Sequence, residues 1–274
     1  MAAKRFELTA DNYHSPEANR RYFSVSQLKT FLDCPARAMA EIRGEYQQPM
    51  TKALMMGNYF DAWVEGTLDK FKENNPEIFN LRTGELKNDY QQVEEIIKRV
   101  KSDEVFMEYL RGDKQKIITF KLFGAPFKMK MDVYLEGERI VDTKLMRSMD
   151  RIMGVSFVSH WHYDWQTALY AEGEYIANRK DDKQRLETYL AVATKEEPTD
   201  LEVIHIPRWR NEECLAEIEK LMPRFIAYKS GEIEPPRCGV CPYCRSTKKL
   251  TAPIDFGSVG FSNKELALME GKNF

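Results

Sequence analysis

The chain has 274 residues and a mass of 32.1 kDa, which predicts one large domain or one domain with a small appendage. Its 43% of hydrophobic residues suffice for a packed core, and its formal net charge of -2 excludes only a globally basic nucleic-acid binder, because a local basic groove can lie on a neutral protein. The sequence shows neither a secretory signal nor an apolar run long enough for a membrane, so we expect a cytoplasmic protein with no membrane partner. Clustered cysteines then indicate metal binding rather than disulfides.

The first part of the chain is predicted to be flexible and then helical. Residues 1–20 are polar, and we expect them to be flexible. Ser26 is typical of an N-cap in front of an apolar helical pattern. In the helix predicted over residues 50–68, Asp61 lies on the same face as Gly57, so a small residue leaves room beside this carboxylate. Apolar spacing predicts helices at residues 27–34, 35–42, 50–68 and 89–110.

A predicted hairpin in the centre of the chain carries the most informative residues. If it is symmetric about the turn at Gly137, Asp132 lies opposite Asp142, with Cβ atoms about 4.5–5.5 Å apart. Two facing carboxylates favour a divalent cation with hard oxygen ligands, Mg2+ or Mn2+. Lys144 shares a strand face with Asp142 and could hold a scissile phosphate or a water. Alternatively, these are ordinary surface residues, and a one-residue slip in register would separate the pair. The two strands cover residues 127–135 and 139–144.

The rest of the chain completes an α/β fold with a mixed sheet. Gln166 and Tyr170 share a face of a predicted helix, where this polar pair contacts phosphate, orders the site or simply faces the solvent. We expect residues 251–274 to form a loosely held tail. Further strands are predicted at residues 116–123, 186–194 and 201–206, and further helices at residues 164–179 and 211–229.

The five cysteines divide into a group of four and a single residue. Cys238, Cys241 and Cys244 form a CxxCxxC run, and two-residue spacing lets thiolates converge on one metal centre, as in zinc knuckles and iron–sulfur proteins. The candidate for a fourth ligand is Cys34. Cys214 lies in an amphipathic helical pattern and is predicted to be a buried apolar residue. Spacing alone leaves both zinc and an iron–sulfur cluster open.

Together, these motifs resemble the PD-(D/E)XK nuclease superfamily, specifically its RecB-like and RecE-like branch. The resemblance covers roughly residues 22 to 250. Within the superfamily, the chain looks most similar to phage and prophage exonucleases of the RecE type, which are exodeoxyribonuclease VIII-like. It is carried by four motifs, which are the opening Ser24-x-Ser26-x-Leu28-x-x-Phe31-x-x-Cys34-Pro35, the D…DxK core of Asp132, Asp142, Thr143 and Lys144, the QxxxY pair of Gln166 and Tyr170, and the one-plus-three cysteines.

The resemblance implies a fold, an activity and partners. The fold would be a restriction-endonuclease-like core, a single nuclease domain over residues 21–250, with a mixed central sheet flanked by helices and N-terminal helices tied to the C-terminal cysteines. The activity would be that of a Mg2+- or Mn2+-dependent exonuclease that resects linear double-stranded DNA ends for phage-type recombination. A single-strand annealing protein and a homo-oligomeric ring are implied partners, in a phage or prophage protein acting in a bacterial cell. The alternative is a module that binds DNA ends or a recombination partner without cleaving.

The resemblance also implies roles for individual residues. Asp132, Asp142, Lys144, Gln166 and Tyr170 would be catalytic. Asp61 would complete the metal shell of Asp132, Asp142 and the Thr143 carbonyl, at a place where relatives usually have a histidine. Lys128, Lys130, Arg147 and Arg151 would guide the DNA backbone, or else are ordinary surface charge. Cys34, Cys238, Cys241 and Cys244 would hold a structural 4Fe-4S cluster, with structural Zn2+ as the alternative, because the CxxCxxC spacing is tighter than is common in relatives.

Overall fold

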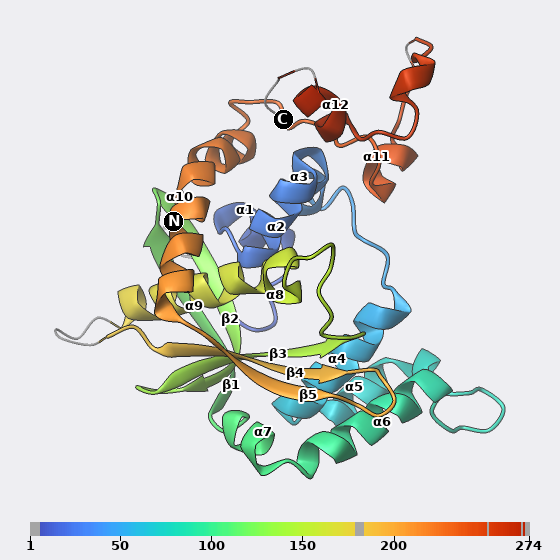
Figure 1. Ribbon diagram of the computed structural model, residues 1–274, viewed down its shortest axis with the longest axis vertical. Helices are drawn as coiled ribbons and strands as arrows, with labels where there is room; N and C mark the ends of the chain where they lie inside the picture. Colours follow the sequence, from blue (N-terminus) through green and yellow to red (C-terminus); the bar gives the residue numbers. More distant parts are fainter. Residues whose placement is uncertain (1–5, 179–183, 251, 270, 272–274) are drawn as a thin grey trace, which may run out of the picture. The chain divides into compact units, whose positions relative to one another are not determined.

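The fold is known from a computed structural model that describes residues 6–178, 184–250, 252–269 and 271 (Figure 1). It divides into two compact units. One, called the sheet unit here, consists of Pro49–Lys121 and Lys128–Ile218, and the other, the cysteine unit, consists of Met1–Gln48, Leu122–Phe127 and Glu219–Phe274. The expected division into residues 1–20, 21–250 and 251–274 stays a prediction. Of these, residues 1–5, 251, 270 and 272–274 lie outside the described part of the chain. Residue 179, the last of the helix predicted over residues 164–179, also lies outside it. Among the described residues, no helix is long and apolar enough to cross a membrane.

The predicted mixed sheet is confirmed. Five strands lie in the order β1-β2-β3-β4-β5. β2 and β3 are antiparallel, β3 and β4 are parallel, and β4 and β5 are antiparallel. The parallel pair requires a crossover connection, which here contains the helices α8 (Phe157–His160) and α9 (Tyr163–Ala177). The strands are β1 (Asp113–Leu122), β2 (Ala125–Leu135), β3 (Arg139–Met146), β4 (Glu187–Thr194) and β5 (Leu201–Ile206).

Helices cover both faces of the sheet in the sheet unit (Figure 1). Along β4, Ala191 and Ala193 pack into the core formed with α4 and α6, whereas Leu190 and Val192 pack with α8 on the opposite face. Successive side chains of a strand point to opposite faces, and a strand that is buried on both faces carries apolar residues on both, as residues 189–193 of β4 do. The helices are α4 (Lys52–Glu65), α5 (Leu68–Asn74), η1 (Pro76–Ile78), α6 (Asn88–Lys101), α7 (Glu104–Tyr109), α8 (Phe157–His160) and α9 (Tyr163–Ala177).

Local capping residues move three predicted helix boundaries. The helix α2 (Val25–Asp33) is capped by Ser24 rather than Ser26, because the Ser24 hydroxyl accepts the Gln27 N–H. The predicted helix over residues 50–68 ends earlier, since Gly66 has a left-handed backbone and α5 begins after it. The predicted helix over residues 89–110 is divided into α6 and α7, because the Asp103 side chain accepts the Phe106 N–H at 2.9 Å and caps α7.

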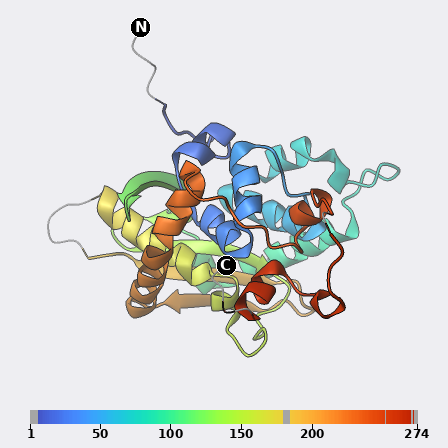
Figure 2. The same ribbon diagram turned by 90° about the horizontal axis from the view of Figure 1, so that it is seen from above.

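The cysteine unit combines N-terminal helices with the C-terminal part of the chain, drawn blue and orange to red in Figure 2. Phe31 of α2 stacks on Phe225 of α10, with ring centroids 5.1 Å apart. The Lys229 ammonium donates to the Tyr22 carbonyl at 2.7 Å and lies 4.0 Å from the Phe23 ring centroid. The helices of this unit are α1 (Pro16–Arg21), α2 (Val25–Asp33), α3 (Pro35–Arg43), the second half of α10 (Arg208–Ser230), α11 (Pro242–Ser246), η2 (Phe256–Ser258) and α12 (Asn263–Met269).

Candidate functional site

The predicted register of the central hairpin is confirmed by three observed pairs, Val133–Val141, Tyr134–Ile140 and Leu135–Arg139. These pairs are symmetric about Gly137, whose φ of +77° gives the turn a backbone that a glycine adopts without strain. The observed pairs end one residue before Asp132 and Asp142. The same register, continued by one residue, would place these two carboxylates opposite each other on adjacent strands.

Thr143, the residue after Asp142 on β3, contacts carboxylates from β2 and α4. Asp132 Oδ2 accepts the Thr143 N–H at 2.9 Å and lies 3.2 Å from Thr143 Oγ1. The same hydroxyl oxygen lies 3.3 Å from Asp61 Oδ1, so α4 brings its carboxylate to the hairpin. A hydroxyl has one hydrogen, and it can donate to either carboxylate. The space beside Gly57 is open, as predicted, because a Cβ built there meets no atom within 4 Å.

Crowded negative charge marks this part of the site. Burial and then the neighbouring Asp132 carboxylate raise the pKa of Asp61 to about 7, against the opposing effect of Lys144. A carboxyl shifted in this way gains stability as an anion when a cation binds beside it. The available donors are carboxylate oxygens, which are the ligands that Mg2+ and Mn2+ prefer. The residues present therefore fit a divalent cation.

The predicted Gln–Tyr pair contacts the hairpin rather than facing the solvent. Gln166 Nε2 donates to Asp142 Oδ1 at 2.6 Å and lies 2.9 Å from the Tyr170 hydroxyl oxygen. The Tyr170 hydroxyl in turn donates to the Lys130 carbonyl at 2.9 Å. Asp142 is only 1% exposed and Tyr170 6%. The pair therefore connects α9 to both β2 and β3 and fixes the orientation of the Asp142 carboxylate.

Lys144 is held as a cation beside Asp142. The two side chains form an ion pair, and Lys144 Nζ also donates to the Thr143 carbonyl at 3.0 Å. Burial alone lowers the pKa of Lys144, but the Asp142 and Asp132 carboxylates outweigh it, and the pKa lies above its ordinary value. The ammonium also lies 5.1 Å from the Tyr163 ring centroid, on a ring face that attracts cations.

The residues expected to guide DNA divide into buried and exposed ones. Lys128 is 2% exposed, and burial lowers its pKa to about 8. Lys128 is therefore the least accessible of the four residues, and its contact with a DNA backbone stays a prediction. Lys130 is half-buried, and Arg147 and Arg151 are exposed on the segment after β3. The Arg151 guanidinium donates to the Gly154 carbonyl at 2.8 Å.

Gln115 on β1 is a site residue that sequence reasoning missed. Its Nε2 donates to Asp132 Oδ1 at 3.3 Å. Its φ of +54° is uncommon for any residue other than glycine, and such backbones concentrate at functional sites. Its buried Oε1 accepts no hydrogen bond from the described residues. A single glutamine in an alternating strand carries no sequence signal for this conformation.

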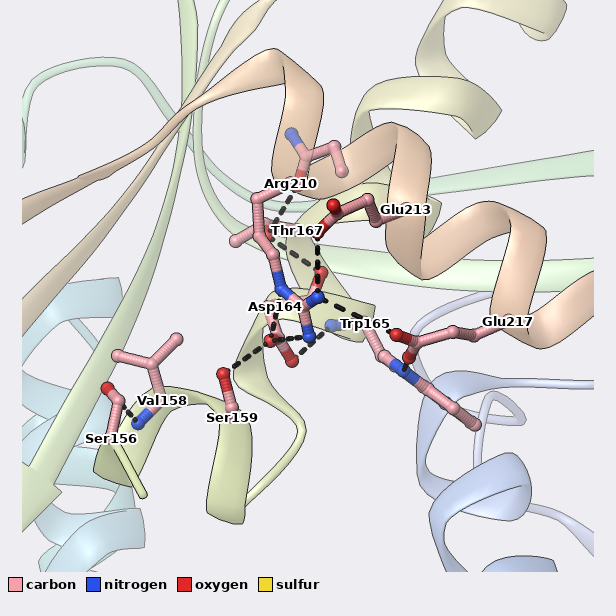
Figure 3. Close-up of polar contacts among 10 residues, drawn as sticks. Ser156, Val158, Ser159, Asp164, Trp165, Thr167, Arg210, Glu213 and Glu217 are labelled. Carbon is pink, nitrogen blue, oxygen red and sulfur yellow. Dashed lines mark hydrogen bonds and ion pairs between the residues drawn. The ribbon is translucent and has the colours of Figure 1, made fainter. Parts of the chain in front are cut away.

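Asp164, at the start of α9, was also missed and positions the helix that carries Gln166 (Figure 3). It is 1% exposed, and its Oδ2 accepts from Arg210 Nη2 at 2.7 Å and from Arg210 Nε at 3.0 Å. The Ser159 hydroxyl donates to the same oxygen at 2.9 Å. A single carboxylate thereby joins α8, α9 and the beginning of α10.

Comparisons with known proteins agree with this geometry. Over residues 24–247 the sequence matches the family described as "PDDEXK-like domain of unknown function (DUF3799)". The chain belongs to this PDDEXK-like family. The crystal structure of a "Putative exonuclease" from Eubacterium rectale is similar to this PDDEXK-like protein, with 39% sequence identity, a TM-score of 0.87, and coverage of 93% of this chain and 98% of that one.

Two other comparisons add no argument for the PDDEXK-like protein. The crystal structure of SSO0001 matches 84% of this chain and 96% of that chain at 12% identity, but its TM-score is 0.33. No curated protein matches. The family and the Eubacterium rectale structure together support a nuclease fold with a nuclease function.

Proposed function

We propose that the protein is a Mg2+- or Mn2+-dependent deoxyribonuclease that hydrolyses phosphodiester bonds and degrades linear double-stranded DNA from its ends. The observation that carries the proposal is the convergence of Asp61, Asp132 and Asp142 with Lys144 around one threonine. The description of the similar Eubacterium rectale protein as a "Putative exonuclease" supports digestion from ends.

The proposed chemistry divides between a cation and the chain's own residues. A divalent cation bound by Asp61, Asp132, Asp142 and the Thr143 carbonyl would neutralise charge on the phosphate and lower the pKa of a bound water. Lys144, fixed by Asp142 and the Thr143 carbonyl, stabilises the negative charge that develops on the phosphate oxygens. Gln166 keeps the Asp142 carboxylate in one orientation, and Tyr170 keeps Gln166 in place.

The proposal extends to a biological setting through the RecE-type resemblance. In this setting, a phage or prophage protein resects DNA ends in the bacterial cytoplasm, and the single-stranded product passes to an annealing protein. A homo-oligomeric ring would keep the enzyme on its substrate. The exposed Arg147 and Arg151 are the proposed contacts to the DNA backbone, and the half-buried Lys130 is a third proposed contact.

A time course on end-labelled linear DNA and covalently closed circular DNA tests the proposal. With Mg2+ or Mn2+, we expect the linear DNA to shorten progressively while the circular DNA persists, and EDTA should stop the reaction. Cleavage of the circular DNA would contradict digestion from ends. Binding to linear ends without cleavage under any metal condition would contradict the nuclease and favour the alternative of a non-cleaving module.

Replacing Asp61 tests its place in the metal shell. We expect Asp61→Ala to raise the Mg2+ concentration needed for half-maximal cleavage by about 10- to 100-fold, because one oxygen donor is lost. Asp61→His should recover part of this loss, since imidazole also binds divalent metals. A Mg2+ titration of the cleavage rate measures both variants. An Asp61→Ala enzyme with the wild-type Mg2+ dependence would show that Asp61 is not a ligand.

A further inference from the structure

The four cysteines of the cysteine unit converge on one point. Their Sγ atoms all lie within 4.8 Å of one another, and Cys34 Sγ lies 3.6 Å and Cys238 Sγ 3.9 Å from Cys244 Sγ. None of the four forms a disulfide, and Cys34, Cys238 and Cys244 are buried. Cys34 stands between α2 and α3, whereas Cys238, Cys241 and Cys244 lie at and before α11.

The spacing of these sulfur atoms discriminates between a single ion and a cluster. An ion bound tetrahedrally by four thiolates at about 2.3 Å holds the sulfur atoms about 3.8 Å apart. The observed 3.6 and 3.9 Å agree with that edge length. In a 4Fe-4S cluster each thiolate binds its own iron at a separate corner of a cube, which holds the ligand sulfur atoms about 6 Å apart. The 4.8 Å limit leaves no room for such a cube.

We propose that Cys34, Cys238, Cys241 and Cys244 bind one Zn2+ ion, rather than the 4Fe-4S cluster that the resemblance to RecB-type nucleases implies. Tetrahedral sulfur coordination is typical of zinc. Four protein ligands leave no open position for a water or a substrate, so the site is structural. The inference is independent of the proposed nuclease activity, because it concerns only residues of the cysteine unit.

Backbone groups around the sulfur atoms support bound thiolates. The Cys241 N–H points to Cys238 Sγ at 3.3 Å, and the Cys244 N–H points to Cys241 Sγ at 3.4 Å. Hydrogen bonds of this kind stabilise the negative charge of the sulfur. Gly239, with a φ of +82°, permits the tight turn that brings Cys238 and Cys241 together.

The same region has a second link between the two segments that supply the ligands. The Ala36 N–H donates to the Pro236 carbonyl at 3.1 Å, directly beside the cysteines. The ion would thus join the start of α3 to a segment about two hundred residues later, and its binding energy would contribute to folding of the cysteine unit. Its soft thiolate ligands also separate it from the hard oxygen set of Asp61 and Asp132, so the two sites select different metals.

Metal and sulfide analysis of the wild-type protein tests the proposal. The full chain is produced in medium that contains both iron and zinc and is purified without oxygen. We expect one zinc per chain, no acid-labile sulfide, and a zinc X-ray absorption spectrum with one shell of four sulfur atoms at about 2.3 Å. Four irons with four sulfides per chain, one iron without sulfide, or protein without bound metal would each overturn the proposal.

A pair of cysteine variants assigns the ion to this cluster. Cys241, the half-buried member of the cluster, is replaced in Cys241→Ser, and Cys214, which is buried in α10 outside the cluster, is replaced in Cys214→Ser as the matched control. In competition with a chromophoric chelator, we expect Cys241→Ser to bind zinc at least about 10-fold more weakly and Cys214→Ser to bind it as the wild type does. Unchanged zinc affinity in Cys241→Ser would overturn the assignment. If Cys241→Ser does not fold, the wild-type stoichiometry and sulfur shell decide the question.

Discussion

Replacing Asp142 with asparagine is expected to lower Mg2+-dependent cleavage of linear DNA by about 100- to 1000-fold, the loss that follows when one electrostatic group is removed from a preorganised site. Asparagine keeps an oxygen that can accept from Gln166 Nε2, so the contact to α9 can persist. What is lost is the negative charge that would bind the cation and that now holds Lys144 in its ion pair. Cleavage rates on end-labelled DNA at saturating Mg2+ measure the effect.

Asp113→Asn provides the matched control for this prediction. Asp113 is an exposed residue at the start of β1, and its nearest cation is Lys116 at 3.9 Å. The same chemical change there should leave the cleavage rate at the wild-type value. Thermal unfolding of both variants checks that the fold is retained. If Asp142→Asn cleaves as fast as Asp113→Asn, the active-site assignment is wrong, and a contaminating nuclease would explain activity in both.

The central hairpin shows how much of the candidate site could be predicted from sequence. Alternating side chains and one glycine define a register about Gly137, and the observed pairs have that register. The apolar run at residues 189–193 within β4 likewise favours a strand, because a strand that is buried on both faces carries apolar residues on both. These features depend on residues close together in sequence, and short-range patterns record them.

The missed residues depend on contacts that no short-range pattern records. Gln115 contacts Asp132 from another strand, with a backbone conformation that its residue type does not favour. Asp164 accepts a hydrogen bond from Arg210, which lies 46 residues later in the sequence. Lys128 occupies a polar position of an alternating strand, yet it is buried, because the pattern of one strand does not show what packs against its second face.

The cysteines show a different limit. The CxxCxxC run and Cys34 identify from sequence the four cysteines that converge in the fold, since thiolates at that spacing converge readily. The size of the bound centre depends on the distance between sulfur atoms, which is a property of the fold. Spacing along the chain is therefore compatible with zinc and with a cluster, and only the convergence of the four Sγ atoms within 4.8 Å favours a single ion.

The second large effect concerns stability. Arg210→Met is expected to lower the free energy of unfolding of the sheet unit by about 3 kcal/mol, because it leaves the buried Asp164 carboxylate without its cation (Figure 3). Arg210 is itself about a quarter exposed, which places the estimate at the lower end of the range for broken buried pairs. Urea unfolding followed by tryptophan fluorescence measures it, since all four tryptophans of the chain belong to the sheet unit.

Two further variants separate a lost ion pair from a lost side chain. Arg208→Met makes the same change two residues earlier in α10. The Arg208 guanidinium is more exposed and forms a looser ion pair, 3.7 Å from Glu187, so its loss should lower the free energy of unfolding by less than about 1 kcal/mol. The double variant Asp164→Leu with Arg210→Met removes both charges and should be more stable than Arg210→Met alone, because an unpaired buried charge costs more than an absent pair. A double variant less stable than the single one would show that Asp164 acts mainly through Ser159 and the backbone of Trp165. In that case, those hydrogen bonds, rather than the ion pair, hold the helix that presents Gln166 and Tyr170 to the hairpin.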